Sequence, residues 1–160
     1  MPDEDRAAYL DGIRMLSRRE LSEAQVRQRL ARREHAASAI DHAIQRLRDE
    51  RALDDARVAE AIARVETGIR RRGRIRVRLQ IERAGIDKAI ARKALDEVFG
   101  ALDDDALLDA SLNKRLRGRQ QIQDDREFQR LFRYLIGQGF EADRVSARLR
   151  ALRRKQPGLE

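Results

Sequence analysis

Three similar turns recur along this chain at intervals of about fifty residues, and this recurrence is the strongest constraint on its fold. Each turn precedes a segment with apolar residues at helical spacing, and the turns stand at Glu34-His35, Gly85-Ile86 and Gly139-Phe140. A period of this size is typical of stacked supersecondary units that bury their apolar faces against neighbouring units. The sequence therefore predicts an elongated array of three tandem three-helix repeats with a long surface rather than a pocket.

Helical periodicity accounts for every long segment, so we expect an all-α fold. The clearest helical segments run from about 5 to 18, 37 to 50, 87 to 99 and 103 to 116. No segment shows the alternation of a half-buried strand, and both prolines, at positions 2 and 157, lie outside the periodic segments. The predicted repeats are 5–52, 53–100 and 101–154, and the tail 155–160 is expected to fray.

The stretch from Gly73 to Ile86 is predicted to be the pivot of the array. On a helical projection, Ile75 and Leu79 fall on one side, and a second apolar stripe falls on the other side. A helix that rests on a single core needs only one apolar stripe. We therefore expect this helix to contact neighbours on both sides and to direct its arginines outward. A similar apolar stripe is expected upstream, at Val58, Ile62, Val65 and Ile69.

Positive charge dominates the 160 residues, which carry 36 Lys and Arg against 28 Asp and Glu, for a formal charge of +8. Arginine suits bidentate contacts to phosphate and carboxylate, so a polyanion or an acidic protein surface is the expected partner. With only six aromatic residues, base stacking is a weaker expectation than phosphate contact. The candidate binding residues are Arg18, Arg19, Arg27, Arg70, Arg71, Arg72, Arg74, Arg76, Arg78, Lys114, Arg115, Arg117 and Arg119.

Catalytic and cofactor-binding patterns are missing from the sequence, and we expect neither an enzyme nor a bound cofactor or metal. Acidic clusters at Asp54-Asp55, Asp103-Asp104-Asp105 and Asp124-Asp125 could hold magnesium in a nuclease, but they precede helical segments, where capping is the preferred interpretation. His35 and His42 have no third metal ligand nearby. The chain has no cysteine and no long apolar run, which predicts a cytoplasmic protein without a membrane partner.

Several motifs resemble the RecX family of bacterial recombination regulators. They are the sequence LSRRE at 16–20 followed by Ser22, the sequence LDDAR at 53–57, the glycine-bounded basic segment 73–86, and Leu135-Ile136 with Gly139-Phe140. The resemblance covers about Tyr9 to Leu152, although Val58 stands where the family often has phenylalanine, and Arg33-Glu34 replaces a lysine–glycine turn.

The resemblance implies a fold of three tandem three-helix repeats without enzymatic activity. It also implies a protein that lies in the groove of the RecA–DNA filament and dampens ATP hydrolysis, strand exchange and coprotease activity. Weak contacts to single- and double-stranded DNA through phosphates are expected, and the protein is predicted to be a monomer.

A second interpretation is a stand-alone DNA-binding regulator that places the pivot helix in a major groove. Such helix-turn-helix proteins are commonly dimers that read spaced half-sites, and no dimerisation helix is evident here. Sequence-selective footprints without RecA would favour this alternative.

Overall fold

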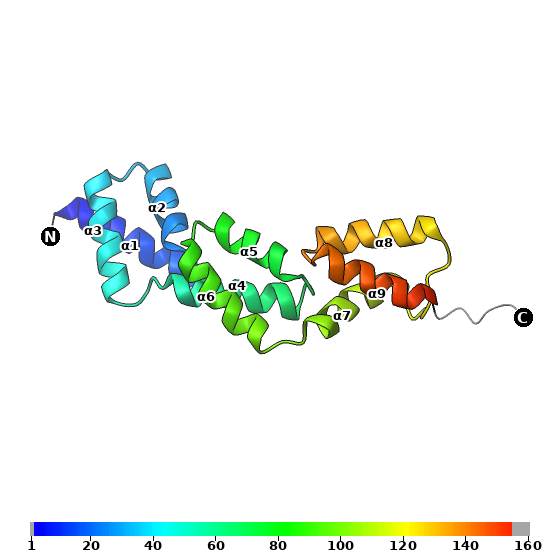
Figure 1. Cartoon of the computed structure of the whole chain (residues 1–160). Coiled ribbons are helices and arrows are strands. Elements are labelled where there is room, and N and C mark those ends of the chain that lie inside the picture. Colours follow the sequence, from blue (N-terminus) through cyan, green and yellow to red (C-terminus); the bar gives the residue numbers. More distant parts are fainter. Residues whose placement is uncertain (1, 155–160) are drawn as a thin grey trace, which may run out of the picture. The chain divides into compact units, whose positions relative to one another are not determined.

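The computed structural model describes residues 2–154, which form nine α-helices and no strand (Figure 1). The helices are α1 (Asp3–Arg18), α2 (Glu23–Arg32), α3 (Ala37–Asp49), α4 (Asp55–Gly68), α5 (Arg74–Arg83), α6 (Lys88–Gly100), α7 (Asp104–Leu116), α8 (Asp125–Gly137) and α9 (Ala142–Arg154). The predicted all-α fold is confirmed. The predicted frayed segment 155–160 lies outside the described residues.

Two compact units divide the chain. Unit 1 comprises Met1–Ile62 and Gln80–Ala94, and unit 2 comprises Ala63–Leu79 and Leu95–Glu160. Helices α4, α5 and α6 each run from one unit into the other. The division into the three repeats 5–52, 53–100 and 101–154 stays a prediction. None of the helices in the described part of the chain is long and apolar enough to cross a membrane.

The core of unit 1 forms where α1, α2 and α3 bury their apolar faces against one another. Its fully buried residues include Ala8, Val26, Leu30, Ile44 and Leu47. Gly12 of α1 belongs to this packing, because a Cβ atom there would lie 2.8 Å from Cδ1 of Leu47. Glycine weakens a helix interior by roughly 1 kcal/mol, and here it allows α1 to lie close to α3.

The N-terminus of α2 meets the turn that follows α5, and both belong to unit 1. Ser22 and Gln25 form the predicted capping box, and the Ser22 hydroxyl also donates to the carbonyl of Ala84. Gly85 in that turn has a φ of 76°, and a Cβ on it would lie 2.5 Å from the Cβ of Ala24. Glycine therefore allows the close approach at this contact, which we call junction 1.

Unit 2 contains a corresponding contact between the N-terminus of α5 and the turn after α8. The backbone N–H of Gly73 donates to Gln138 O at 2.8 Å, and that of Ile75 donates to Gly139 O at 3.1 Å. These bonds satisfy two N–H groups that a helix N-terminus otherwise leaves without partners. A Cβ on Gly73 would lie 2.5 Å from Gly139 O. We call this contact junction 2.

The three turns that recur in the sequence share one backbone feature. Glu34, Gly85 and Gly139 have φ values of 64°, 76° and 95°, so each places a left-handed residue after the second helix of its predicted repeat. Glycine adopts this conformation without a steric penalty, whereas Glu34 does so at a cost of roughly 1–2 kcal/mol.

The core of unit 2 lies among α7, α8 and α9. Leu108, Leu112 and Leu116 of α7 are buried, as their four-residue helical spacing predicts. Leu135 of α8 and Leu149 of α9 complete this core. Asp54, Asp87, Asp103 and Asp124 each accept a hydrogen bond from a backbone N–H in the first turn of the helix that follows. The predicted capping role of the acidic clusters is therefore confirmed at Asp54, Asp103 and Asp124.

Two predicted apolar stripes are wrong in part. Along α4, Val65 is 44% and Ile69 is 70% exposed, while Glu66 is buried with its carboxylate paired to Arg72 at 2.7 Å. The buried face of α4 is rotated toward Ala59 and Ala63, whose small side chains permit close packing.

On α5, Ile75 and Leu79 are exposed, and the buried stripe is Val77, Ile81 and Ala84. The pivot helix thus rests on one apolar face rather than two. Its N-terminal backbone forms the hydrogen bonds of junction 2.

Candidate functional site

A basic cleft lies in unit 2 where the end of α7, the segment 117–124 and one face of α8 come together. Its volume is about 540 Å³, within the range of roughly 300–1,000 Å³ that is usual for ligand sites. Its lining residues are Lys114, Arg115, Arg117, Arg119, Glu127, Arg130, Leu131 and Tyr134. Five cations against one carboxylate leave the cleft a net charge of +4 at neutral pH, which suits an anionic ligand.

The backbone at the end of α7 presents its cations to the cleft. Arg117 follows the helix with a φ of 50°, and Gly118 continues in the left-handed region with a φ of 84°. Leu116 before this bend and Ile122 after it are both almost fully buried. The segment between them is therefore anchored at both ends by apolar contacts, and its basic side chains remain at the surface.

Glu127 holds the segment 117–124 against α8. Its carboxylate accepts hydrogen bonds from the Arg119 guanidinium and from the Gln123 backbone N–H, the latter at 2.8 Å. The hydrogen bond from Arg119 lowers the pKa of Glu127, although burial opposes this shift. The carboxylate therefore stays ionised inside the cleft and orders one of its arginines.

Replacing Glu127 with Gln is expected to lower the free energy of unfolding near neutral pH by about 2 kcal/mol, because a hydrogen bond to a charged group is lost. The folded pKa of Glu127 is lowered, so its contribution is complete above the unfolded pKa of about 4.3 and is lost as the pH falls through the folded value. The variant should therefore lose less stability in acid than the wild type.

Urea denaturation followed by circular dichroism at about pH 7 and about pH 3 measures this difference. Asp11 and Glu23 also have lowered pKa values and contribute the same acid loss to both proteins. If the free energy of unfolding falls as much in acid for the variant as for the wild type, the assigned role of Glu127 is contradicted.

The remaining cations of the cleft differ in how firmly they are held. Lys114 donates to the Ile69 carbonyl at 3.4 Å, and the guanidinium carbon of Arg115 lies 4.1 Å from the ring centroid of Tyr134. Within residues 2–154, the side chains of Arg117 and Arg130 form no hydrogen bond or ion pair, although the charge of Arg130 contributes to the lowered pKa of Glu127. These two exposed guanidinium groups are the most available to an incoming anion.

The cleft brings together four of the predicted binding residues, Lys114, Arg115, Arg117 and Arg119. Sequence reasoning missed Arg130, Tyr134 and Glu127, which follow each other at three- and four-residue spacing on α8. Residues three and four positions apart lie on one face of a helix, so this spacing in the sequence could have grouped the three residues.

Several other predicted binding arginines take part in contacts within unit 2. Arg70 and Arg72 pair with Glu66, Arg74 pairs with Asp96, and Arg76 donates to the Gly137 carbonyl. Arg72 is largely covered, with 17% of its side chain exposed. Arg78 is exposed on α5. Substitution of Arg72 or Arg76 would therefore alter the fold as well as the surface charge.

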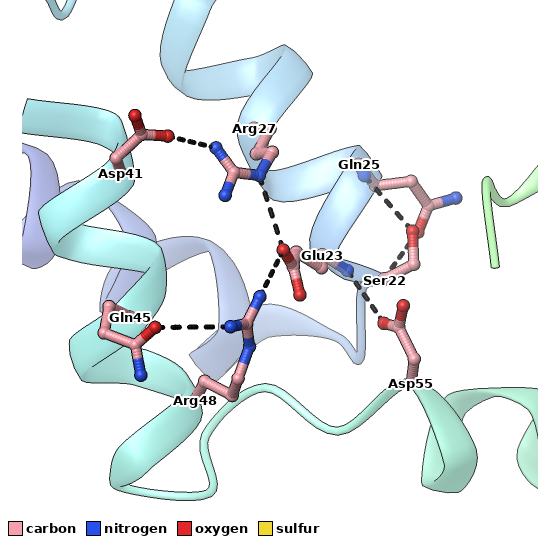
Figure 2. Close-up of polar contacts among 8 residues, drawn as sticks. All are labelled: Ser22, Glu23, Gln25, Arg27, Asp41, Gln45, Arg48 and Asp55. Atoms are coloured by element: carbon pink, nitrogen blue, oxygen red, sulfur yellow. Dashed lines mark hydrogen bonds and ion pairs between the residues drawn. The ribbon is translucent and has the colours of Figure 1, made fainter. Parts of the chain in front are cut away.

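In unit 1, Arg27 belongs to a polar network that ties α2 to α3 and α4 (Figure 2). Its guanidinium pairs with Glu23 and with Asp41 at 2.6 Å. The Glu23 carboxylate also accepts from Arg48 at 2.6 Å, and the Glu23 N–H donates to Asp55 at 2.9 Å. Arg48 and Arg27 lower the pKa of Glu23, while burial opposes them. Both arginines of this network pair with carboxylates inside unit 1, which favours a structural role.

Arg18 and Arg19 of unit 1 and Arg71 of unit 2 are exposed, and none of the three side chains forms a hydrogen bond or ion pair among the described residues. His35 contacts Asp11 at 2.7 Å, and His42 contacts Asp5 at 2.8 Å, so both histidines fasten α1 to neighbouring segments. In the described part of the chain, no three His, Cys, Asp or Glu residues are placed to hold a metal ion together.

Comparison with known proteins shows that this chain is similar to regulatory proteins of one family. A family model described as "RecX, first three-helix domain" matches residues 8–47. The chain is 32% identical over 134 residues to a protein named "Regulatory protein RecX" from Syntrophotalea carbinolica, covering 83% of this chain and 88% of that protein. A protein of the same name from Chromohalobacter salexigens is 33% identical over 135 residues, covering 84% and 86%.

The fold is similar to the crystal structure of RecX from Lactobacillus salivarius, with a TM-score of 0.78 at 19% identity. That alignment covers 95% of this chain and 98% of the other.

Proposed function

The chain belongs to the RecX family of regulatory proteins, and from this premise we propose that it binds the filament that RecA forms on DNA. Bound there, it slows ATP hydrolysis and strand exchange and dampens coprotease activity. It acts in the cytoplasm as a monomer without a cofactor or a catalytic activity of its own. The observation that carries the proposal is the basic cleft, whose net positive charge suits the phosphates of a filament or an acidic face of its protein subunits.

Two separate sets of cations support binding at more than one point. The cleft belongs to unit 2, and the exposed pair Arg18 and Arg19 belongs to unit 1. When one set is bound, the other is held at a high effective concentration near a repeating polymer, so weak contacts combine into a slow dissociation. A chain that engages neighbouring subunits in this way would restrain the subunit motions of ATP turnover or block access of duplex DNA.

The test is the rate of RecA ATP hydrolysis on single-stranded DNA with substoichiometric amounts of the purified protein. We expect the rate to fall several-fold, and to fall less at high salt because phosphate contacts are screened. An unchanged rate with up to equimolar protein would contradict the proposal.

Footprinting on duplex DNA without RecA serves as the parallel measurement. Protection of defined half-sites would instead support the stand-alone DNA-binding regulator.

A further inference from the structure

The basic cleft combines two features that phosphate contact alone does not need, namely a hollow of restricted size and a flat aromatic wall. The hollow of about 540 Å³ is lined by Tyr134, whose ring lies under the Arg115 guanidinium at 4.1 Å. A general electrostatic surface for a duplex requires neither feature. Their presence together therefore points to a more specific ligand than a uniform polyanion.

The pair formed by Arg115 and Tyr134 offers a stacking surface for a nucleobase. Unstacked bases are bound on aromatic rings and on guanidinium planes, and each such contact is tolerant of sequence. Because the guanidinium lies over the ring, the pair presents flat π surfaces whichever member faces the ligand. In a duplex the bases are stacked on one another, so this surface suits a single strand.

The cations around the pair are placed to hold a backbone. Arg117 and Arg130 line the same cleft as Lys114, and their side chains form no hydrogen bond or ion pair within residues 2–154. Arg119 is fixed by Glu127 and keeps that carboxylate neutralised. An acidic peptide would use these cations, but it would leave the Arg115–Tyr134 surface without a role.

We propose that this cleft binds one short segment of single-stranded nucleic acid, with its phosphates on Lys114, Arg117 and Arg130 and a base stacked on the Arg115–Tyr134 pair. The inference rests on the proposed function and deepens it, since it names the component of the filament that this site contacts. Binding is expected to be weak, independent of sequence and sensitive to salt. The logarithm of the binding constant should fall with the logarithm of the salt concentration, with a slope of about −0.7 for each phosphate held.

Fluorescence anisotropy of a labelled oligothymidylate, titrated with the full chain in the absence of RecA, tests the site directly. Tyr134→Leu should weaken binding to the single strand roughly tenfold and leave binding to a labelled duplex unchanged. Arg117→Glu should weaken binding to both and reduce the magnitude of the salt slope by about 1. If Tyr134→Leu loses helicity, Arg115→Lys is the variant that decides, because it keeps the positive charge and removes the planar guanidinium, so the same selectivity is expected.

Lys93→Glu is the matched control, because it makes the same change in charge at an exposed residue of α6 outside the cleft. It should change affinity by no more than about twofold. The proposal is overturned if the stacking variants bind single strands like the wild type, or if poly-glutamate displaces the oligonucleotide at equal charge concentration, which would assign the cleft to an acidic protein segment. Both measurements omit RecA, so a failure here is distinguishable from a failure of ATPase inhibition.

Discussion

Gly139→Ala is expected to lower the free energy of unfolding by about 4 kcal/mol and the melting temperature by roughly 10 °C. Gly139 has a φ of 95°, a conformation that alanine adopts only with strain. The added Cβ would overlap the backbone nitrogen of Arg76 and lie 2.9 Å from its Cα atom. A backbone cannot rotate away as a flexible side chain does, so the turn or α5 must move.

That movement would disrupt junction 2. The carbonyl of Gly139 accepts from Ile75 N–H, and the neighbouring Gln138 carbonyl accepts from Gly73 N–H. Separating the turn from α5 would expose both donors and remove the end of α5 from its contact with the turn. The expected loss therefore combines backbone strain, overlap and two weakened hydrogen bonds.

Thermal and urea denaturation followed by circular dichroism measure the effect, with two matched controls. Gly137→Ala makes the same chemical change two residues earlier, where no heavy atom lies within 4 Å, and should cost nothing. Glu34→Gly relieves a left-handed residue in the corresponding turn of α2 and should add about 1 kcal/mol of stability. Equal stability of Gly139→Ala and Gly137→Ala would show that junction 2 does not require glycine.

The recurring turns are the part of the fold that the sequence predicted best. Glycine at positions 85 and 139 marks a left-handed residue, and both glycines also allow another backbone or side chain to approach closely. Glu34 shows the limit of this signal, because it has the same conformation without glycine. Only the side-chain and backbone neighbours at junctions 1 and 2 explain why the second and third turns require a residue without a Cβ.

Periodicity located α4 and α5 but identified the faces that they bury only in part, at Val58 and at Val77, Ile81 and Ala84. An aliphatic spacing of three and four residues indicated Val65 and Ile69, whereas the structure buries Ala59, Ala63 and Glu66. Two arginines of the segment after α4, Arg70 and Arg72, compensate the buried carboxylate of Glu66. Neither the distance between helices nor the partner of a charge is contained in the spacing of one helix.

The sequence predicted that the candidate site is positively charged, but not which of the basic side chains are available to a partner. Basic runs at 70–78 and 114–119 look alike in the sequence. In the structure, the side chains of Arg72 and Arg76 of the first run are bound within the fold, whereas the side chain of Arg117 in the second has no hydrogen bond or ion pair among residues 2–154. Whether an arginine is available to a partner depends on carboxylates and carbonyls that are distant in the sequence.

The largest functional effect is expected from reversing the charge of the cleft. Lys114→Glu, Arg117→Glu and Arg130→Glu combined should raise the protein concentration needed for half-maximal inhibition of RecA ATP hydrolysis on the order of a hundredfold. The triple variant changes the net charge of the cleft from +4 to −2 and repels the phosphates that it is proposed to hold. None of the three side chains pairs with a carboxylate within residues 2–154, so helicity should be retained.

Equal charge reversal elsewhere separates the cleft from the total charge of the protein. Lys88, Arg92 and Lys93 are exposed on α6, and their combined replacement by Glu gives the same net charge as the cleft variant. This control should inhibit RecA within about threefold of the wild type, because long-range attraction is screened at physiological salt. Similar losses in both triple variants would mean that inhibition follows overall charge. A cleft variant as active as the wild type would place the contact outside the cleft, with exposed Arg18, Arg19 and Arg71 as the next residues to reverse.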